Sequence, residues 1–330
     1  MNPVGSSPLD APLLQVEHLR KIYSVRSRRS WKKDRLVAVD DVSFVIREKE
    51  TYGLVGESGS GKSTTGRTIL RLTEPTGGKA LFQNEDIFSM SSKRLNQLRK
   101  QVQMIFQDPY SSLDPKKRIW YTVAEPLTIH KIGTRQVRKA RAIELLERVG
   151  FSEHHMNRYP HEFSGGQRQR IGIAKALALN PKLVICDEPV SALDVSIQSQ
   201  ILNLLMELQE ERGLAYLFIA HDLSVVRHIA DRIGVMYLGN LVEEAQTDEL
   251  FAQPLHPYTQ LLLSSMPPPH PSLKRERIIL QGEIPSPINP PGGCVFHTRC
   301  PYATEKCKLE KPVEHQVAPG HRVKCHLYAS

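Results

Sequence analysis

The chain has 330 residues, a net charge of +9 and an apolar fraction of 40%, which is ample for a buried core and excludes a disordered chain. No stretch approaches the roughly 18 uninterrupted apolar residues of a membrane span. The N-terminal residues Pro3, Pro8, Asp10 and Pro12 lack the pattern of a secretory signal, so we expect a globular cytoplasmic protein. The basic charge is compatible with a solvated surface, with binding to nucleic acid or with binding to an anionic membrane, and net charge alone does not distinguish these alternatives.

A basic run near the N-terminus contributes part of this excess charge. Its members are Arg26, Arg28, Arg29, Lys32, Lys33 and Arg35, against the single acid Asp34. The run fits a basic loop that faces phosphates, and it fits a disordered solvated insertion about equally well.

The first elements in chain order are predicted β segments at residues 13–25 and 36–57, rich in Leu, Val, Ile, Phe and Tyr. They end at a glycine-rich turn, after which a helix is predicted from Thr64 to Leu72. Between about 90 and 160 the composition changes to Arg-, Lys- and Glu-rich segments with helical spacing, such as Val137 to Val149. This change predicts a helical insertion.

The next part of the chain alternates short apolar strands with amphipathic helices. Helices are predicted over 168–179 and 197–212, and buried strands over 182–186 and 215–220. The alternation predicts a mainly parallel sheet with helices on both faces. From Gln253 onward prolines become dense, and we expect an irregular extension that does not add to the sheet.

A phosphate-binding loop is the clearest motif, because it follows an apolar strand and precedes a helix. It fits the pattern G-x-x-x-x-G-K-[ST] with Gly56, Glu57, Ser58, Gly59, Ser60, Gly61, Lys62 and Ser63, and Thr64 follows. Backbone N–H groups of such a loop face phosphate oxygens, and the helix dipole adds positive potential. We expect Lys62 to reach the β and γ phosphates and the Ser63 hydroxyl to ligate Mg²⁺.

Two adjacent acids follow the apolar strand that ends at Cys186, where ligands bind in parallel sheets. Asp187 is suited to hold Mg²⁺ through water, and Glu188 to polarise the attacking water as a general base. Cys186 itself is most simply a small buried hydrophobe. Together with the loop, these acids predict an NTPase, a class that includes kinases, helicases and GTPases.

A third motif, Ser164-Gly165-Gly166-Gln167, precedes a helix and closely resembles the signature of ABC ATPases, which caps the γ-phosphate of ATP bound to the opposite subunit. The resemblance covers residues 13–250 and implies roles for further residues in chain order. Tyr23 is expected to stack on adenine, and Gln107 to touch Mg²⁺ or the attacking water. Asp194 is expected to communicate across the dimer, and His221 to hold the γ-phosphate. Taken alone, each of three of these residues also has a purely structural interpretation. Gln107 could be an ordinary loop amide, His221 a histidine of the core and Tyr23 a packed strand residue.

The resemblance to ABC ATPases implies an α/β fold: a P-loop NTPase core with a mainly parallel sheet, an antiparallel β subdomain and a helical subdomain at about 90–165. It further implies that residues 13–250 form an ATPase domain. Two such domains are expected to associate head to tail, with ATP bound between them. The rival is an ABC ATPase that acts on nucleic acid without a membrane partner. The single ATPase domain and the short helical insertion, which lacks sustained heptads, argue against it.

Residues 251–330 form an extension with a second resemblance, to the extension of oligopeptide, dipeptide and nickel importer ATPases, most of all the second ATPase subunit of a dipeptide importer. The motifs that carry it are His256-Pro257-Tyr258-Thr259, Gly293-Cys294-Val295-Phe296 and Arg299-Cys300-Pro301. It implies import of dipeptides or oligopeptides, with nickel or another small solute as the alternative cargo.

The same resemblance implies a set of partners and a location. The partners are a second homologous ATPase, two transmembrane permease subunits and a periplasmic or extracellular peptide-binding protein, with no dedicated nucleic acid. The implied location is the cytoplasmic face of the inner membrane.

Four cysteines crowd the extension: Cys294, Cys300, Cys307 and Cys325. A reducing compartment disfavours disulfides, and four thiolates suit a metal. The C-x₂-C pair usual in zinc sites is absent, so a [4Fe-4S] cluster is favoured over Zn²⁺, although the spacing matches no standard ferredoxin. Four free thiols in a loose tail are the remaining alternative.

Overall fold

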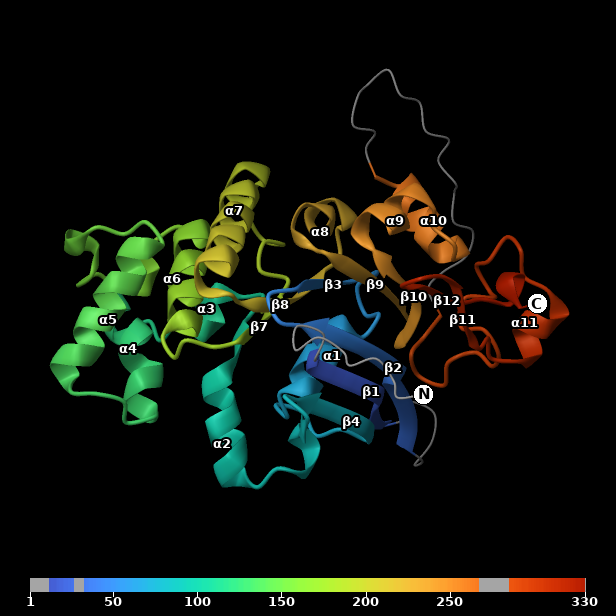
Figure 1. The fold of residues 1–330 in the computed structure, drawn as a ribbon, viewed down its shortest axis with the longest axis horizontal. Helices are drawn as coiled ribbons and strands as arrows, with labels where there is room; N and C mark the ends of the chain where they lie inside the picture. The colour runs from blue at the N-terminus through green and yellow to red at the C-terminus, as the bar shows by residue number, and fades with distance from the viewer. Residues whose placement is uncertain (1–11, 27–32, 267–284, 330) are drawn as a thin grey trace, which may run out of the picture. The chain divides into compact units, whose positions relative to one another are not determined.

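The computed structural model describes residues 12–26, 33–266 and 285–329 (Figure 1). The chain divides into two compact units. Unit 1 contains the described parts of 1–47, 51–89 and 220–330, and unit 2 contains 48–50 and 90–219. Arg28, Arg29 and Lys32 of the basic run, and the prolines at 267–269, lie outside the described residues.

Unit 1 contains an antiparallel sheet in the strand order β2-β1-β4-β5. Its strands are β1 (Pro12–Arg26), β2 (Lys33–Arg47), β4 (Gly77–Phe82) and β5 (Glu85–Asp86). In the β1–β2 pair Leu14 faces Ile46 and Tyr23 faces Leu36. At the end of β2 the alternate side chains Val42, Phe44 and Ile46 are buried, as the period of a half-buried strand requires. The antiparallel β subdomain predicted from the sequence is confirmed.

The second sheet of unit 1 has the order β11-β12-β10-β9-β3. Its strands are β3 (Thr51–Val55), β9 (Arg232–Tyr237), β10 (Asn240–Gln246), β11 (Glu314–Ala318) and β12 (His321–Lys324). The parallel pair β3–β9 is completely buried, which is why both strands are predominantly apolar.

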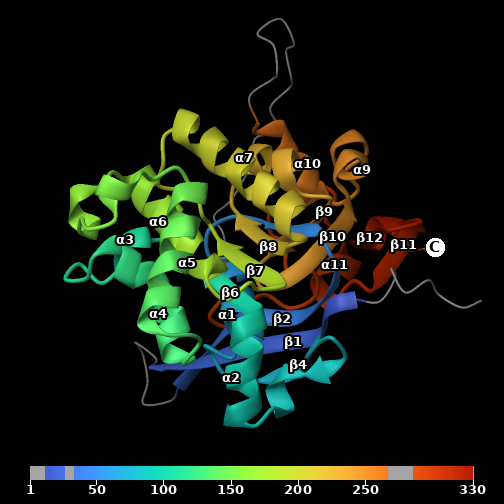
Figure 2. The same cartoon turned by 60° about the vertical axis from the view of Figure 1, so that its left-hand side comes forward.

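Helices cover both faces of this second sheet (Figures 1 and 2). On one face lie α8 (Leu223–Ile229), α9 (Thr247–Ala252) and α10 (Pro257–Ser264). On the other face α1 (Lys62–Ile69) contacts β1 and β2, and so lies between the two sheets of the unit. The short helix α11 (Glu305–Leu309) belongs to the extension.

The extension adds two strands to the sheet, so the expectation that it would not do so is wrong. β12 pairs with β10 through Glu243↔Val323 and Glu244↔Arg322, and β11 pairs with β12. Both new strands are short and mostly polar, so they lack the apolar pattern by which a buried strand is recognised. Residues 287–289 also bind β2, through the N–H of Val37 and the carbonyl of Arg35.

Two buried acids on β10 obtain some of their partners from the extension. Glu243 and Glu244 are each 1% exposed, and buried carboxylates must be paired. Glu243 pairs with His321 Nε2 at 2.8 Å and accepts hydrogen bonds from the N–H groups of Leu255 and His256. Glu244 accepts a hydrogen bond from the Tyr52 hydroxyl and pairs with Arg232 and Arg322.

Unit 2 combines a parallel sheet, in the order β8-β7-β6, with six helices among its described residues. The strands are β6 (Val102–Ile105), β7 (Leu183–Asp187) and β8 (Ala215–Ala220). The helices are α2 (Ser92–Gln101), α3 (Pro109–Ser112), α4 (Ile119–Ile129), α5 (Arg135–Arg148), α6 (Gly165–Leu177) and α7 (Val195–Arg212). Figure 2 shows α4, α5 and α6 packed together. Helices α4 and α5 lie in the predicted helical insertion, and α6 follows it.

Helices α6 and α7 begin earlier than their apolar spacing suggests, because Ser164 and Asp194 cap them. The α/β fold predicted from the sequence is confirmed, while the domain boundary after residue 250 stays a prediction. None of the helices in the described ranges is both long and apolar enough to cross a membrane.

Candidate nucleotide site

The phosphate-binding loop joins β3 to α1 in unit 1, and two of its glycines are required by close contacts. Gly61 has φ 104°, and a Cβ there would lie 2.2 Å from the carbonyl oxygen of Ala38 in β2. A Cβ on Gly56 would lie 2.1 Å from the carbonyl oxygen of Met236 in β9. The loop therefore lies directly against the backbones of two strands, which only glycine permits.

Lys62, the first residue of α1, lies inside the loop with only 3% of its surface exposed. Its Nζ donates hydrogen bonds to the carbonyl oxygens of Gly56 and Glu57, at 2.7 and 2.9 Å, and to Ser60 Oγ at 3.3 Å. Ser63, half-buried, follows in the first turn. The ammonium thus lies at the positive end of the helix dipole, which suits the binding of phosphate.

Glu57 in the loop is held by two residues of the extension. Its N–H donates a hydrogen bond to the Tyr258 hydroxyl at 2.9 Å. Its carboxylate accepts from Nη1 and Nη2 of Arg299, at 2.9 and 3.3 Å. No role for Tyr258 or Arg299 is predicted from the sequence, where the only signal is that both lie in the motifs that mark the extension.

In unit 2 the structure brings Gln107 and Glu188 together. β7 ends at the buried Asp187, and Glu188 follows with φ 48° and donates its N–H to the carbonyl of Ile219 at 3.0 Å. Gln107 follows β6, the neighbour of β7, and its Nε2 donates to the Glu188 carboxylate at 2.8 Å. The amide thereby orients the carboxylate that was predicted to polarise water.

The signature residues form the start of α6. Ser164 Oγ accepts from the N–H of Gln167 at 3.3 Å, and Gln167 Oε1 accepts from the N–H of Ser164 at 3.0 Å. Gly166 is buried, and a Cβ there would lie 2.4 Å from Ile197 Cγ2. Ser164 and Gly165 are exposed, so this helix end is accessible to an anion.

Three other predicted site residues are Asp194 in unit 2 and His221 and Tyr23 in unit 1. Asp194 is exposed and caps α7, and the hydrogen bond from the N–H of Ile197, at 3.0 Å, lowers its pKa. His221 is exposed between β8 and α8. Tyr23 in β1 is 36% exposed, with Lys21 Nζ 4.5 Å from its ring centroid, so its ring is not part of the core.

The four cysteines of the extension lie in one region of unit 1. The N–H of Cys294 donates to the carbonyl of Cys307 at 2.8 Å. Burial raises the pKa of the Cys294 thiol to about 11, and the nearby Cys307, Cys325 and Cys300 add to this rise. Yet across the described ranges no group of three or more Cys, His, Asp or Glu side chains is arranged to hold a metal ion. The predicted iron–sulfur or zinc site therefore has no support in this arrangement.

Comparisons with known families match both parts of the chain. Residues 39–191 match the family described as "ABC transporter", and residues 242–307 match "Oligopeptide/dipeptide transporter, C-terminal region". The oligopeptide transport ATP-binding protein AppF of Bacillus subtilis is 55% identical, over 96% of this chain and 98% of that protein. A putative peptide import ATP-binding protein of Brucella ovis, BOV_A0347, is 51% identical over 96% and 98%.

Two solved structures are similar in fold. The ATP-binding cassette MJ0796, in a dimeric post-hydrolysis state bound to ADP and Pi, has a TM-score of 0.63 and 30% identity, over 71% of this chain and 98% of that one. The cbiO1 protein of Clostridium perfringens, part of the ABC transporter complex cbiONQ, has a TM-score of 0.63 and 29% identity over 73% and 91%.

Proposed function

The chain belongs to the ATP-binding subunits of ABC transporters, and from this membership we propose that it hydrolyses ATP to drive the import of dipeptides or oligopeptides. The observation that carries the proposal is the phosphate-binding loop, in which Lys62 lies buried among loop carbonyls at the start of α1. The cargo class is supported by the match at residues 242–307 and by relatives named for oligopeptide transport and peptide import.

The candidate residues supply the groups that phosphoryl transfer to water requires. We propose that the loop N–H groups and Lys62 hold the β and γ phosphates of ATP. Ser63, Gln107 and Asp187 are the candidates for holding Mg²⁺, because their oxygen donors suit a hard cation. When bound, Mg²⁺ neutralises negative charge on the phosphate oxygens. Glu188 then orients and polarises the attacking water, and the hydrogen bond from Gln107 fixes the direction of its carboxylate.

Two such subunits are proposed to close head to tail, so that Ser164 and Gly166 of one cap the ATP held by the other. The exposure of Ser164 and Gly165 at the start of α6 supports this, since a helix N-terminus attracts anions. His221 is the candidate contact to the γ-phosphate, Asp194 the candidate residue for communication between subunits, and Tyr23 the candidate support for adenine. The binding energy for the γ-phosphate, which includes the contacts of the partner's Ser164 and Gly166, exists only in the closed state, so ATP shifts the population toward closure.

The partners follow from the same proposal. We expect a similar but non-identical ATPase as the second subunit, two transmembrane permease subunits and a peptide-binding protein outside the membrane. The chain would then lie at the cytoplasmic face of the inner membrane, bound through the permeases. Support comes from relatives that are named as ATP-binding proteins of transport and import systems.

Uptake of a radiolabelled tripeptide tests the proposed cargo. Cells that lack this chain should lose most of the ATP-dependent uptake, and expression of the wild-type chain should restore it, because the permeases cannot cycle without ATP-driven closure. Uptake of labelled Ni²⁺, measured in the same cells, is the control. Unchanged tripeptide uptake with reduced Ni²⁺ uptake would contradict peptide import and favour a nickel importer.

For the extension we propose that Cys294, Cys300, Cys307 and Cys325 hold a [4Fe-4S] cluster, with Zn²⁺ as the alternative. The proposal is motivated by the sequence, in which four cysteines share a segment rich in proline and glycine, while the described residues show no arrangement for a metal. Anaerobically purified protein should be brown and contain about four iron atoms per chain. Each Cys→Ser substitution should lower the iron content, measured by mass spectrometry.

Cys186→Ser is the matched control, because Cys186 is completely buried in β7 of unit 2. It should leave the iron content unchanged. One tightly bound zinc per chain would rule out the cluster and retain the site. Metal-free protein with four thiols that react with a thiol reagent would rule out both.

A further inference from the structure

We propose that Arg299 is a positioning residue for the phosphate-binding loop: it neutralises the Glu57 carboxylate, so that the C-terminal extension sets the affinity of the loop for ATP. The inference rests on the proposed binding of ATP at this loop. All residues involved belong to unit 1.

The negative charge of a carboxylate in this loop has to be neutralised by a nearby positive charge. Glu57 is the second residue of a loop that is proposed to bind a polyanion, and its side chain is only 24% exposed. Like charges repel more strongly at a partly buried site than in bulk water. The backbone of Glu57 is also engaged, because its carbonyl oxygen accepts from Lys62 Nζ and from the N–H of Ser60. A shift of Glu57 would therefore move Lys62 as well.

Arg299 supplies the compensating charge in a fixed geometry. Both of its Nη atoms donate to the Glu57 carboxylate, the bidentate arrangement that a planar guanidinium favours. Its side chain is 6% exposed, and its guanidinium lies 5.9 Å from the ring centroid of Tyr237. The N–H of Arg299 donates to the carbonyl of Phe296, which is itself 1% exposed. Arg299 is thus anchored through the core of the extension.

Tyr258 provides a second and separate contact to the same residue. It is completely buried in α10, and its hydroxyl accepts the Glu57 N–H. The rings of Tyr237 and Phe296 pack against Tyr258, with centroids 4.7 and 5.4 Å away. Two segments of the extension, around 258 and around 299, therefore converge on one residue of the loop.

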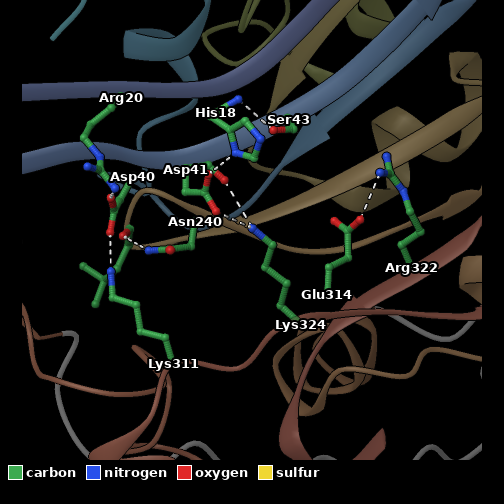
Figure 3. A network of polar contacts seen from close by, with 11 residues as sticks. His18, Arg20, Asp40, Asp41, Ser43, Asn240, Lys311, Glu314, Arg322 and Lys324 are labelled. Carbon is green, nitrogen blue, oxygen red and sulfur yellow. Dashed lines mark hydrogen bonds and ion pairs between the residues drawn. The ribbon is translucent and has the colours of Figure 1, made fainter. Parts of the chain in front are cut away.

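Ion pairs elsewhere in unit 1 supply a control (Figure 3). Lys311 of the extension pairs with Asp40 at 2.8 Å, and Lys324 pairs with Asp41 at 3.3 Å. The side chain of Lys311 is 65% exposed, and such exposed pairs contribute little to stability. Lys311→Ala thus removes a charge of the extension without touching Glu57.

The experiment measures the Kd for ATP of the full chain at low and high salt. Arg299→Ala should raise the Kd about tenfold, because the carboxylate is left without its partner and repels the phosphates. High salt should reduce this defect by screening. Adding Glu57→Gln to Arg299→Ala should return the Kd to within about twofold of wild type, since the repelling charge is gone. Lys311→Ala should leave the Kd unchanged.

Two results would overturn the inference. One is wild-type affinity in Arg299→Ala. The other is a double variant as weak as Arg299→Ala, which would mean that Arg299 acts only through the folding of the extension. Should Arg299→Ala fail to fold, Arg299→Gln decides. The amide keeps a hydrogen-bond donor but carries no charge, so the Kd must rise, whereas a purely structural contact would leave the Kd unchanged. Failure of the proposed function is seen separately, as a wild-type chain that binds no ATP.

Discussion

Replacing Glu188 by glutamine should leave ATP binding intact and slow hydrolysis by about 10²- to 10⁴-fold, the contribution of a well-placed general base. The amide keeps the size of the side chain but cannot polarise water as a carboxylate does. Gln107, which donates to this carboxylate at 2.8 Å, can still form a hydrogen bond to the amide oxygen, so the local structure is retained. The measurement is single-turnover hydrolysis in the assembled complex, with the site of the partner ATPase silenced.

Glu210→Gln is the matched control for this substitution. Glu210 is an exposed residue of α7 in the same unit, and its loss should leave the hydrolysis rate unchanged. Wild-type turnover in Glu188→Gln would show that another residue polarises the water, and Glu188 would then lose its assigned role.

Lys62→Ala should nearly abolish ATP binding. Truncating a buried, hydrogen-bonded charge costs about 2 to 5 kcal/mol, which corresponds to about a 30- to 4,000-fold loss of affinity. The loop also loses the internal hydrogen bonds from Nζ to the carbonyls of Gly56 and Glu57, so its shape changes together with its charge. Isothermal titration calorimetry with ATP measures the affinity, and circular dichroism confirms that the variant is folded.

Lys79→Ala provides the comparison, because Lys79 is an exposed lysine of β4 in the same unit. It should bind ATP like the wild type. If Lys62→Ala binds as tightly as Lys79→Ala, the phosphates are held by the backbone N–H groups of the loop alone.

The parts of the site that local sequence patterns encode were predictable. The loop at 56–63, the acids after β7 and the helix start at Ser164 each consist of neighbouring residues whose spacing has a direct physical meaning. The contact between Arg299 and Glu57 was not predictable in this way, because the two residues are 242 positions apart. An isolated arginine in a proline-rich segment has no pattern that names its partner.

The structure of the extension was also only partly predictable from local sequence patterns. The spacing of its four cysteines suggested a shared metal, but spacing does not determine where thiols point, and the described residues show no arrangement for a metal. Strands β11 and β12 were missed because their residues are mostly polar. Their place in the sheet depends on Glu243 and Glu244, whose need for partners becomes visible only when both are seen to be buried.

The pairing of β12 with β10 has a consequence for how the protein is made. His321 and Glu243 are 78 positions apart, so β10 leaves the ribosome well before the strand that completes its edge. Until then two carboxylates and a row of backbone groups lack their final partners, a state that favours aggregation. A truncation that removes β12 would keep every candidate residue of the nucleotide site and still leave this edge open. Production of the protein, whether in its cell or in the laboratory, therefore depends on residues remote from the nucleotide.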